Sequence, residues 1–263
     1  MAMTLKLTRQ VDRLHVRVYA DRQAMGEAAG REAAEAIKER LREAGTARII
    51  FAAAPSQNEF LQTLAADAEI DWSRITVFHM DEYIGLSTDA PQLFSRFLRE
   101  GLFDRVRPGT VHLLDASVDA EAEMRRYAGL LAEAPIDIVC LGIGENGHIA
   151  FNDPPVADFS DPFAVKAVEL DEACRKQQVN DGCFAKLADV PTHAMTLTIP
   201  TLMAGGRLFC MVPGPTKRDA VRHTLEGPIG TACPASILRT HPACTLYVDE
   251  DSYGLGWSGR YGV

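Results

Sequence analysis

Short β-rich runs alternate with longer helical patterns along most of the chain, and this alternation limits the possible folds more than any other feature. Strands are expected at residues 14–19, 47–52, 74–80, 110–114, 136–141, 195–199, 207–212 and 245–249. Helices are expected at residues 21–44, from about residue 58, and at residues 92–103, 118–131 and 216–225. Strands separated by helices of this length predict βαβ crossovers and an α/β fold. We therefore expect a doubly wound, mostly parallel sheet with helices on both faces.

The size and composition of the chain favour one large Rossmann-like domain spanning residues 1–263 over two small ones. Apolar residues make up 47% of the 263 residues and charged residues 24%, which is enough for a sizeable core. Residues 151–163 contain three prolines and should form an irregular loop. The Gly-rich C-terminus, residues 251–263, is unlike a packed helix.

The charge balance indicates which partners to expect. A formal charge of −9 argues against a nucleic-acid surface, which needs clustered Lys and Arg. A small anionic substrate remains compatible with this charge if the pocket is locally positive. The composition leaves a homo-oligomer open.

The expected compartment is the cytoplasm. The N-terminus lacks the apolar core of a signal peptide, and no segment approaches the roughly 18 apolar residues of a membrane span. The six cysteines form no CxxC pair, which suits reduced thiols and argues against disulfides or a zinc site.

A glycine-rich segment comes directly after the strand expected at residues 136–141. It contains a GxGxxG pattern at Gly142, Gly144 and Gly147, but prolines at 154 and 155 stop any helix that a dinucleotide site would require. We interpret the segment as a turn that brings backbone close to a ligand and presents His148 at the sheet edge.

Two carboxylates, Asp81 and Glu82, come directly after the strand expected at residues 74–80. Burial at a strand end can raise the pKa of a carboxyl group toward the range useful for proton transfer. Because successive residues of an extended segment point to opposite faces, only one of the two should face a site. A structural role for Asp81, capping the next turn, is equally compatible with the local sequence.

Two motifs carry a family resemblance. Phe78-His-Met-Asp-Glu-Tyr-Ile-Gly-Leu86 and Gly142-Ile-Gly-Glu-Asn-Gly-His-Ile-Ala-Phe-Asn-Asp-Pro154 resemble the signature segments of glucosamine-6-phosphate deaminases. A looser likeness extends over most of the chain. The 6-phosphogluconolactonases of the same superfamily carry a Thr-Ala-Ser-Leu-Phe-Pro-like run after the motif histidine, whereas the run after His148 is of the deaminase kind.

The resemblance implies catalytic roles for four residues. Asp81 would be the base that moves a proton from C2 to C1 of the open-chain sugar, and His148 would act on the ring oxygen to open the pyranose. Asp153, where relatives have Glu, would orient the imidazole. Asn146 stands where relatives have Asp and cannot supply a negative charge to an imidazolium. This chemistry requires no metal ion and no nicotinamide cofactor.

The phosphate site departs further from the family pattern. Relatives carry a Thr-Gly-Gly-Thr-Pro-like loop where this chain has residues 52–58, which leaves Ser56 as a candidate ligand or, equally, as a plain helix N-cap. Lys217 matches the phosphate lysine of the family. The arginine of an Asn-x-Arg-Phe-Phe-like run is absent, and Arg175 or Lys176 is the candidate to replace it. The remaining expected binding residues are Gly144, Gly147 and Glu82.

Two other functions compete with deamination. One is a lactonase-like hydrolase, or an isomerase of another sugar phosphate, on the same fold. The other is a non-catalytic sugar-phosphate-binding module, which predicts a DNA-binding domain in the same chain and loss of the Asp81/His148 pair. The sequence shows neither of those two features.

Overall fold

The computed structural model describes residues 4–255, whose centre is an eight-stranded sheet in the order β1-β2-β11-β10-β7-β3-β4-β6. All neighbouring strands of this sheet run parallel except β1 and β2, which are antiparallel. The mostly parallel α/β sheet predicted from the sequence is therefore confirmed, with β1 added at one edge. The strands are β1 (Leu5–Val11), β2 (Leu14–Tyr19), β3 (Ala47–Phe51), β4 (Ile75–His79), β6 (Thr110–His112), β7 (Ile138–Leu141), β10 (Arg207–Val212) and β11 (Cys244–Asp249).

Helices cover both faces of the sheet, because successive strand residues feed two separate cores. In β3, Ile49 and Phe51 pack into one core with helices α1, α2 and α3, while Ile50 packs into the other with α5, α7 and α8. The helices are α1 (Arg22–Ala44), α2 (Asn58–Ala66), α3 (Phe94–Leu98), α4 (Asp104–Val106), α5 (Ala120–Ala132), α6 (Glu172–Asn180), α7 (Ile199–Met203), α8 (Arg218–Glu226) and α9 (Glu250–Tyr253).

The long helix α1 has defined ends. The Asp21 side chain accepts a hydrogen bond from the Ala24 backbone N–H, and the helix stops at Gly45, whose φ of 81° favours glycine. The single helix expected at residues 92–103 is instead split. A π-helical turn, η3 (Arg99–Phe103), comes after α3 and leads into the short α4.

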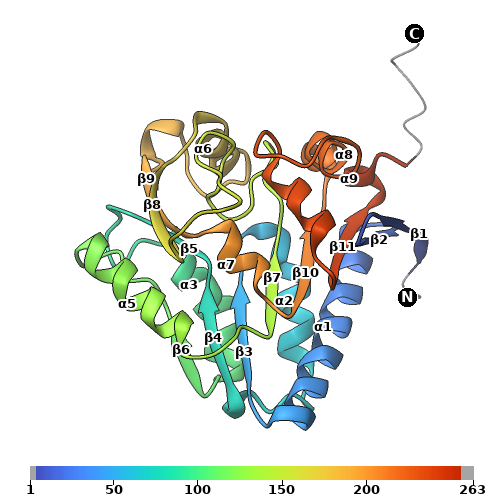
Figure 1. The fold of residues 1–263 in the computed structure, drawn as a ribbon, viewed down its shortest axis with the longest axis horizontal. Helices are drawn as coiled ribbons and strands as arrows, with labels where there is room; N and C mark the ends of the chain where they lie inside the picture. The colour runs from blue at the N-terminus through green and yellow to red at the C-terminus, as the bar shows by residue number, and fades with distance from the viewer. Residues whose placement is uncertain (1–3, 256–263) are drawn as a thin grey trace.

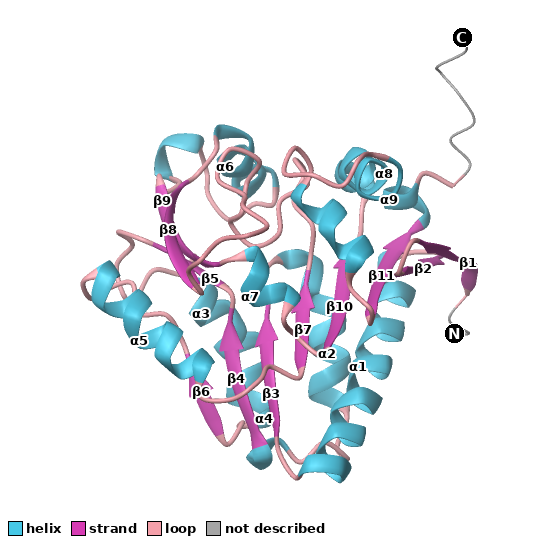
Figure 2. Cartoon of the chain, viewed as in Figure 1, coloured by secondary structure: helices cyan, strands magenta, loops and turns pink. Residues whose placement is uncertain are grey.

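A second, antiparallel sheet in the order β5-β9-β8 was not predicted. It contains β5 (Asp81–Tyr83), β8 (Val165–Glu169) and β9 (His193–Leu197), and it lies beyond the carboxyl ends of the central strands together with α6 (Figures 1 and 2). The strand expected at residues 195–199 belongs to this sheet and not to the main one. Periodicity identified it as a strand but could not identify its pairing partners.

The loop expected at residues 151–163 contains no helix or strand. Residues 251–263 were expected not to form a packed helix, but their first residues belong to α9. This helix starts at a capping box formed by Asp249 and Ser252, and Gly254 caps its C-terminal end. Residues 256–263 of the Gly-rich tail lie outside the described residues. Within residues 4–255, no helix is long and apolar enough to cross a lipid bilayer.

Candidate active site

A cavity of about 290 Å³ lies at the carboxyl ends of β3, β4, β7 and β10. Its walls are the segments that come after these four strands, joined by residues of α6 and the first residue of α1. Ligands of open α/β sheets bind at this end of the strands. Asp81 and His148 both line the cavity, so the two residues on which the proton shuttle depends share one space.

Asp81 is held at the cavity wall by strand pairing. It is the first residue of β5, where it pairs with Thr196 of β9, and its side chain is 7% exposed. Burial, and secondarily the negative charge of Glu82, raises the pKa of Asp81 well above its usual range. No side chain or backbone group of residues 4–255 donates a hydrogen bond to its carboxylate. Its carboxylate therefore binds a proton more readily than an ordinary aspartate, because no such donor among the described residues stabilises the charged form.

Glu82 faces the opposite way and does not line the cavity. Its buried carboxylate accepts hydrogen bonds from the backbone N–H groups of Tyr83, Phe94 and Ser95 at 2.9–3.1 Å. Nε2 of His79 lies 3.6 Å away. Despite the opposing effect of burial, His79 and Ser95 lower the pKa of Glu82. Adjacent β-strand residues point to opposite faces, so Glu82, which was expected to bind the substrate, lies away from the cavity. There it accepts hydrogen bonds from the start of α3, and its charge raises the pKa of Asp81.

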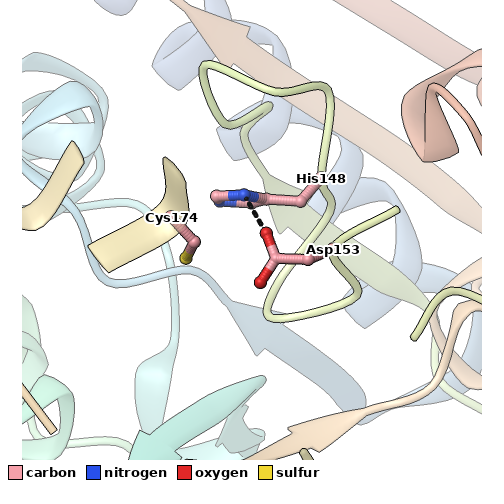
Figure 3. A group of neighbouring side chains, drawn as sticks. All are labelled: His148, Asp153 and Cys174. Atoms are coloured by element: carbon pink, nitrogen blue, oxygen red, sulfur yellow. Dashed lines mark ion pairs between the residues drawn. The ribbon is translucent and has the colours of Figure 1, made fainter. Parts of the chain in front are cut away.

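Asp153 holds the ring of His148. Nδ1 of His148 lies 2.8 Å from Oδ1 of Asp153. Figure 3 marks this ion pair with a dashed line. The Asn146 amide donates to the same oxygen at 2.9 Å and accepts from the His148 backbone N–H at 3.1 Å. Burial acts against ionisation of Asp153, but His148 and then Asn146 outweigh it and lower its pKa. An ionised Asp153 fixes the proton on Nδ1 and leaves Nε2 to exchange protons with a ligand.

The glycines of the β7 loop make room for this ring. A Cβ at Gly144 would lie 2.1–2.4 Å from three atoms of the His148 imidazole. Gly147 has a φ of +86°, and a Cβ there would lie 2.7 Å from Sγ of Cys233. Gly144 lines the cavity, whereas Gly147 does not. The expected binding role of Gly147 is therefore replaced by a structural one, in the turn that presents the histidine.

The turns after β3 and β10 are built alike. Ala54-Pro-Ser-Gln57 and Gly214-Pro-Thr-Lys217 each form a single 3₁₀ turn that leads into a nine-residue helix, α2 or α8. β7 lies between β3 and β10, so the two turns flank the Gly142 loop. Both helices begin at the cavity, and helix N-termini favour anions. Together the two turns form the end of the cavity best suited to an anionic group.

Ser56 and Lys217, the two expected anion ligands, both lie at this end of the cavity. Ser56 does not cap α2 through its side chain, which removes the structural alternative for that residue. Burial lowers the pKa of Lys217, with a partly compensating effect from Asp181 and Glu145. No hydrogen bond of Lys217 Nζ is found within residues 4–255, so this buried cation remains available to a ligand.

Arg175 lies elsewhere, contrary to expectation. It donates through Nη2 to the backbone oxygens of Leu187 and Val190 at 2.9 Å and does not line the cavity. Lys176 pairs with Glu172 along the helix. From α6, Gln177 and Gln178 line the cavity instead.

Several cavity residues were not identified from the sequence, namely Arg22, Gln57, Gln177, Gln178 and Asp181. Gln57 could have been found by aligning the turns that succeed the individual strands, since it occupies the position in its turn that Lys217 occupies in the other. No local pattern marks Arg22, which begins a helix far from the other cavity residues in sequence.

Cys174 completes a close group with His148 and Asp153 (Figure 3). Each of the three side chains has an atom that could bind a metal ion, and these three atoms all lie within 4.8 Å of one another. Metal binding by cysteine requires the thiolate. Burial, and then the carboxylate of Asp153, raises the pKa of Cys174, which opposes that form.

Comparison with known families agrees with the motifs. The family model described as glucosamine-6-phosphate isomerases/6-phosphogluconolactonase matches residues 20–247. The chain belongs to this family. The resemblance to the glucosamine-6-phosphate deaminase/isomerase family, stated from the two motifs, is thereby confirmed.

Individual members of the isomerase/lactonase family are similar over most of their length. A glucosamine-6-phosphate deaminase of Listeria innocua is 34% identical over 228 residues, which is 86% of this chain and 95% of that protein. A deaminase of Bacillus cytotoxicus is 37% identical over 190 residues, covering 71% of this chain and 70% of its own.

Solved structures show the same family fold. A monomeric glucosamine-6-phosphate deaminase superposes with a TM-score of 0.83 at 30% identity, covering 91% of this chain and 99% of the other. A 6-phosphogluconolactonase from Shewanella baltica gives a TM-score of 0.74 at 19% identity, over 92% and 97% of the two chains. The second likeness concerns the fold alone.

Proposed function

We propose that this chain is an enzyme that isomerises and deaminates an amino-sugar phosphate, converting glucosamine 6-phosphate and water to fructose 6-phosphate and ammonia. The observation that carries the proposal is the shared cavity of Asp81 and His148. The relatives named glucosamine-6-phosphate deaminase, at 34% and 37% identity, support the same reaction.

The proposed reaction begins with ring opening. His148, oriented by Asp153, passes a proton to the ring oxygen O5 while the C1 hydroxyl loses one, so that the C1–O5 bond breaks and the C1 aldehyde forms. Asp81 as the carboxylate then takes the C2 proton, while the aldehyde oxygen O1 gains a proton and the C2 ammonium loses one. Asp81 returns its proton to C1, which leaves a C1 hydroxyl and an iminium carbon at C2. Water adds to C2 and ammonia departs, giving the ketose. Positioned acid–base groups of this kind each contribute about 10²- to 10⁴-fold in rate.

The substrate's anionic group is proposed to sit between the two matching turns. Ser56 offers a hydroxyl, Lys217 a buried ammonium, and the starts of α2 and α8 their backbone N–H groups. With the phosphate at that end, the sugar carbons extend toward Asp81 and His148 at the ends of β4 and β7.

We also propose that the described residues form one domain and that the enzyme works in the cytoplasm. Both hydrophobic cores rest on the same eight-stranded sheet, which supports a single folding unit. All six cysteines are free, four of them buried, as suits a reducing compartment.

A direct assay tests the proposed reaction. Purified protein is incubated with glucosamine 6-phosphate, and ammonia and fructose 6-phosphate are measured in equal amounts over time. Asp81→Asn serves as the inactive control, and Asp89→Asn, at an exposed loop position, as the active one. No turnover of this substrate, with hydrolysis of a sugar lactone in its place, would contradict the proposal.

A further inference from the structure

Arg22 places a second cation at the cavity, from a part of the chain that no motif indicated. Arg22 is the first residue of α1. Of the lysine and arginine side chains in residues 4–255, those of Arg22 and Lys217 line the cavity. We infer that Arg22 binds the anionic group of the substrate. It would take the place of the phosphate-binding arginine that the family carries and that α6 of this chain does not supply. The inference rests on the proposed function, which it deepens.

The packing of α1 against α2 brings Arg22 to this position. Arg22, Gly26 and Gly30 are spaced by four residues and so share one face of α1. A Cβ at Gly26 would lie 2.4 Å from Cβ of Glu59, and one at Gly30 would lie 2.6 Å from Cβ of Thr63. Only glycine allows the two helices to approach so closely. Arg22, one turn earlier on the same face, therefore reaches the turn that precedes α2.

The contacts of Arg22 fix its guanidinium next to the anion end of the cavity. Nε and Nη2 donate to the two carboxylate oxygens of Glu59 at 2.8 and 3.0 Å, and Nη2 also donates to the Pro55 backbone oxygen at 2.8 Å. Pro55 directly precedes Ser56. Within residues 4–255 no hydrogen bond from Nη1 is found, so its two N–H groups remain available to a ligand. N–H groups of a guanidinium donate strong, charge-assisted hydrogen bonds to phosphate oxygens.

The charge of a phosphate group favours a second cation at this end of the cavity. A phosphate monoester carries about −1.5 to −2 charges near neutral pH. Lys217 alone supplies one positive charge, and the carboxylate of Asp181 lines the same cavity. With Arg22 included, two cations and two helix N-termini lie at the phosphate end of a cavity whose acids are Asp81 and Asp181.

The inference is tested on the full chain by calorimetric titration with inorganic phosphate and by kinetics with glucosamine 6-phosphate. Arg22→Ala should weaken phosphate binding about 10- to 100-fold, the loss of a charged hydrogen-bond pair. It should raise KM for the sugar phosphate similarly while changing kcat little. Arg31→Ala is the matched control, since Arg31 lies on the same helix, pairs with Glu27 and does not line the cavity. Its phosphate binding should equal that of the wild type.

A second variant separates a lost contact from an unpaired charge. Arg22→Ala leaves Glu59, whose side chain is 16% exposed, without its partner, and that carboxylate could itself repel phosphate. In Arg22→Ala/Glu59→Gln both charges are absent. Phosphate binding should stay weak if Arg22 contacts the anion. Recovery to the wild-type affinity, or a wild-type protein that binds no phosphate, would overturn the inference.

The two readouts keep this inference distinct from the proposed reaction. If the wild type releases ammonia and Arg22→Ala binds phosphate and turns over normally, the assignment of Arg22 is wrong and the reaction stands. If Arg22→Ala loses phosphate binding but the wild type releases no ammonia, the reaction is wrong and the anion site stands. Far-UV circular dichroism of each variant checks that α1 remains folded.

Discussion

Asp81 and Asp153 are both buried, Asp81 at the cavity wall and Asp153 behind His148, and yet their pKa values move in opposite directions. Burial dominates at Asp81, where the nearest charge is the like charge of Glu82 and no donor compensates. At Asp153, the imidazole of His148 and the amide of Asn146 outweigh the effect of burial. The neighbours of a buried carboxylate, more than its depth, decide whether it accepts protons or orients another group. The difference supports the proposed roles of Asp81 as the base and of Asp153 as a positioning residue.

The largest expected effect is at Asp81. Asp81→Asn removes the base and should slow exchange of the C2 proton with solvent by about 10⁴-fold, the upper range for a general base. Inorganic-phosphate binding should be unchanged. Exchange is measured by deuterium incorporation from heavy water, and a wild-type exchange rate in the variant would refute the assignment of the base.

The next effect is at His148. His148→Gln should slow turnover of the cyclic sugar phosphate by about 10²- to 10³-fold, as for loss of an acid–base group. An open-chain analogue that needs no ring opening should be affected much less. Comparing kcat/KM for the two substrates is the measurement, and equal losses on both would show that His148 does not open the ring.

A smaller loss is expected at Asp153, because it acts through His148. Asp153→Asn replaces a charged hydrogen bond to the imidazole by a neutral one and should lower kcat about 10- to 100-fold. The pH dependence of kcat should change as well, because the imidazolium loses its negative partner. An unchanged pH profile would limit Asp153 to a structural role.

The smallest effect, at Glu82, tests the comparison most directly. Its negative charge raises the pKa of Asp81, so Glu82→Gln should lower that pKa. Asp81 must be ionised to accept a proton, and a lower pKa keeps it ionised in more acidic solution. The acidic limb of the pH–rate profile should therefore move to lower pH. Thermal unfolding of the variant must be measured in parallel, because Glu82 also accepts three backbone hydrogen bonds. An acidic limb that does not move would show that Glu82 has no influence on the base.

Much of the main sheet could be predicted from the sequence because strand and helix periods are local. The seven central strands and the positions of Asp81 and His148 at strand ends were predicted from runs of a few residues. The small sheet could not be predicted in the same way. β5 is three residues long, and β8 pairs only with β9, so neither has a signal apart from its partner.

The direction in which polar side chains face was the least predictable part of the site. Arg175 was close to the missing arginine in sequence, yet its guanidinium binds two loop carbonyls away from the cavity. Gln57 and Lys217 hold equivalent positions in matching turns, and the placement of these turns on either side of β7 brings both side chains to one cavity.

The sequence by itself determined the α/β class, the family and the pair of residues proposed to move protons, because these depend on local periodicity and on contiguous motifs. The tertiary structure decided which charges surround them. Arg22 reaches the cavity only because two glycines let α1 pack tightly on α2, and Glu82 acts on Asp81 from the far side of a short strand. Electrostatic effects depend on distance in space, and distances between remote segments are fixed only when the chain has folded.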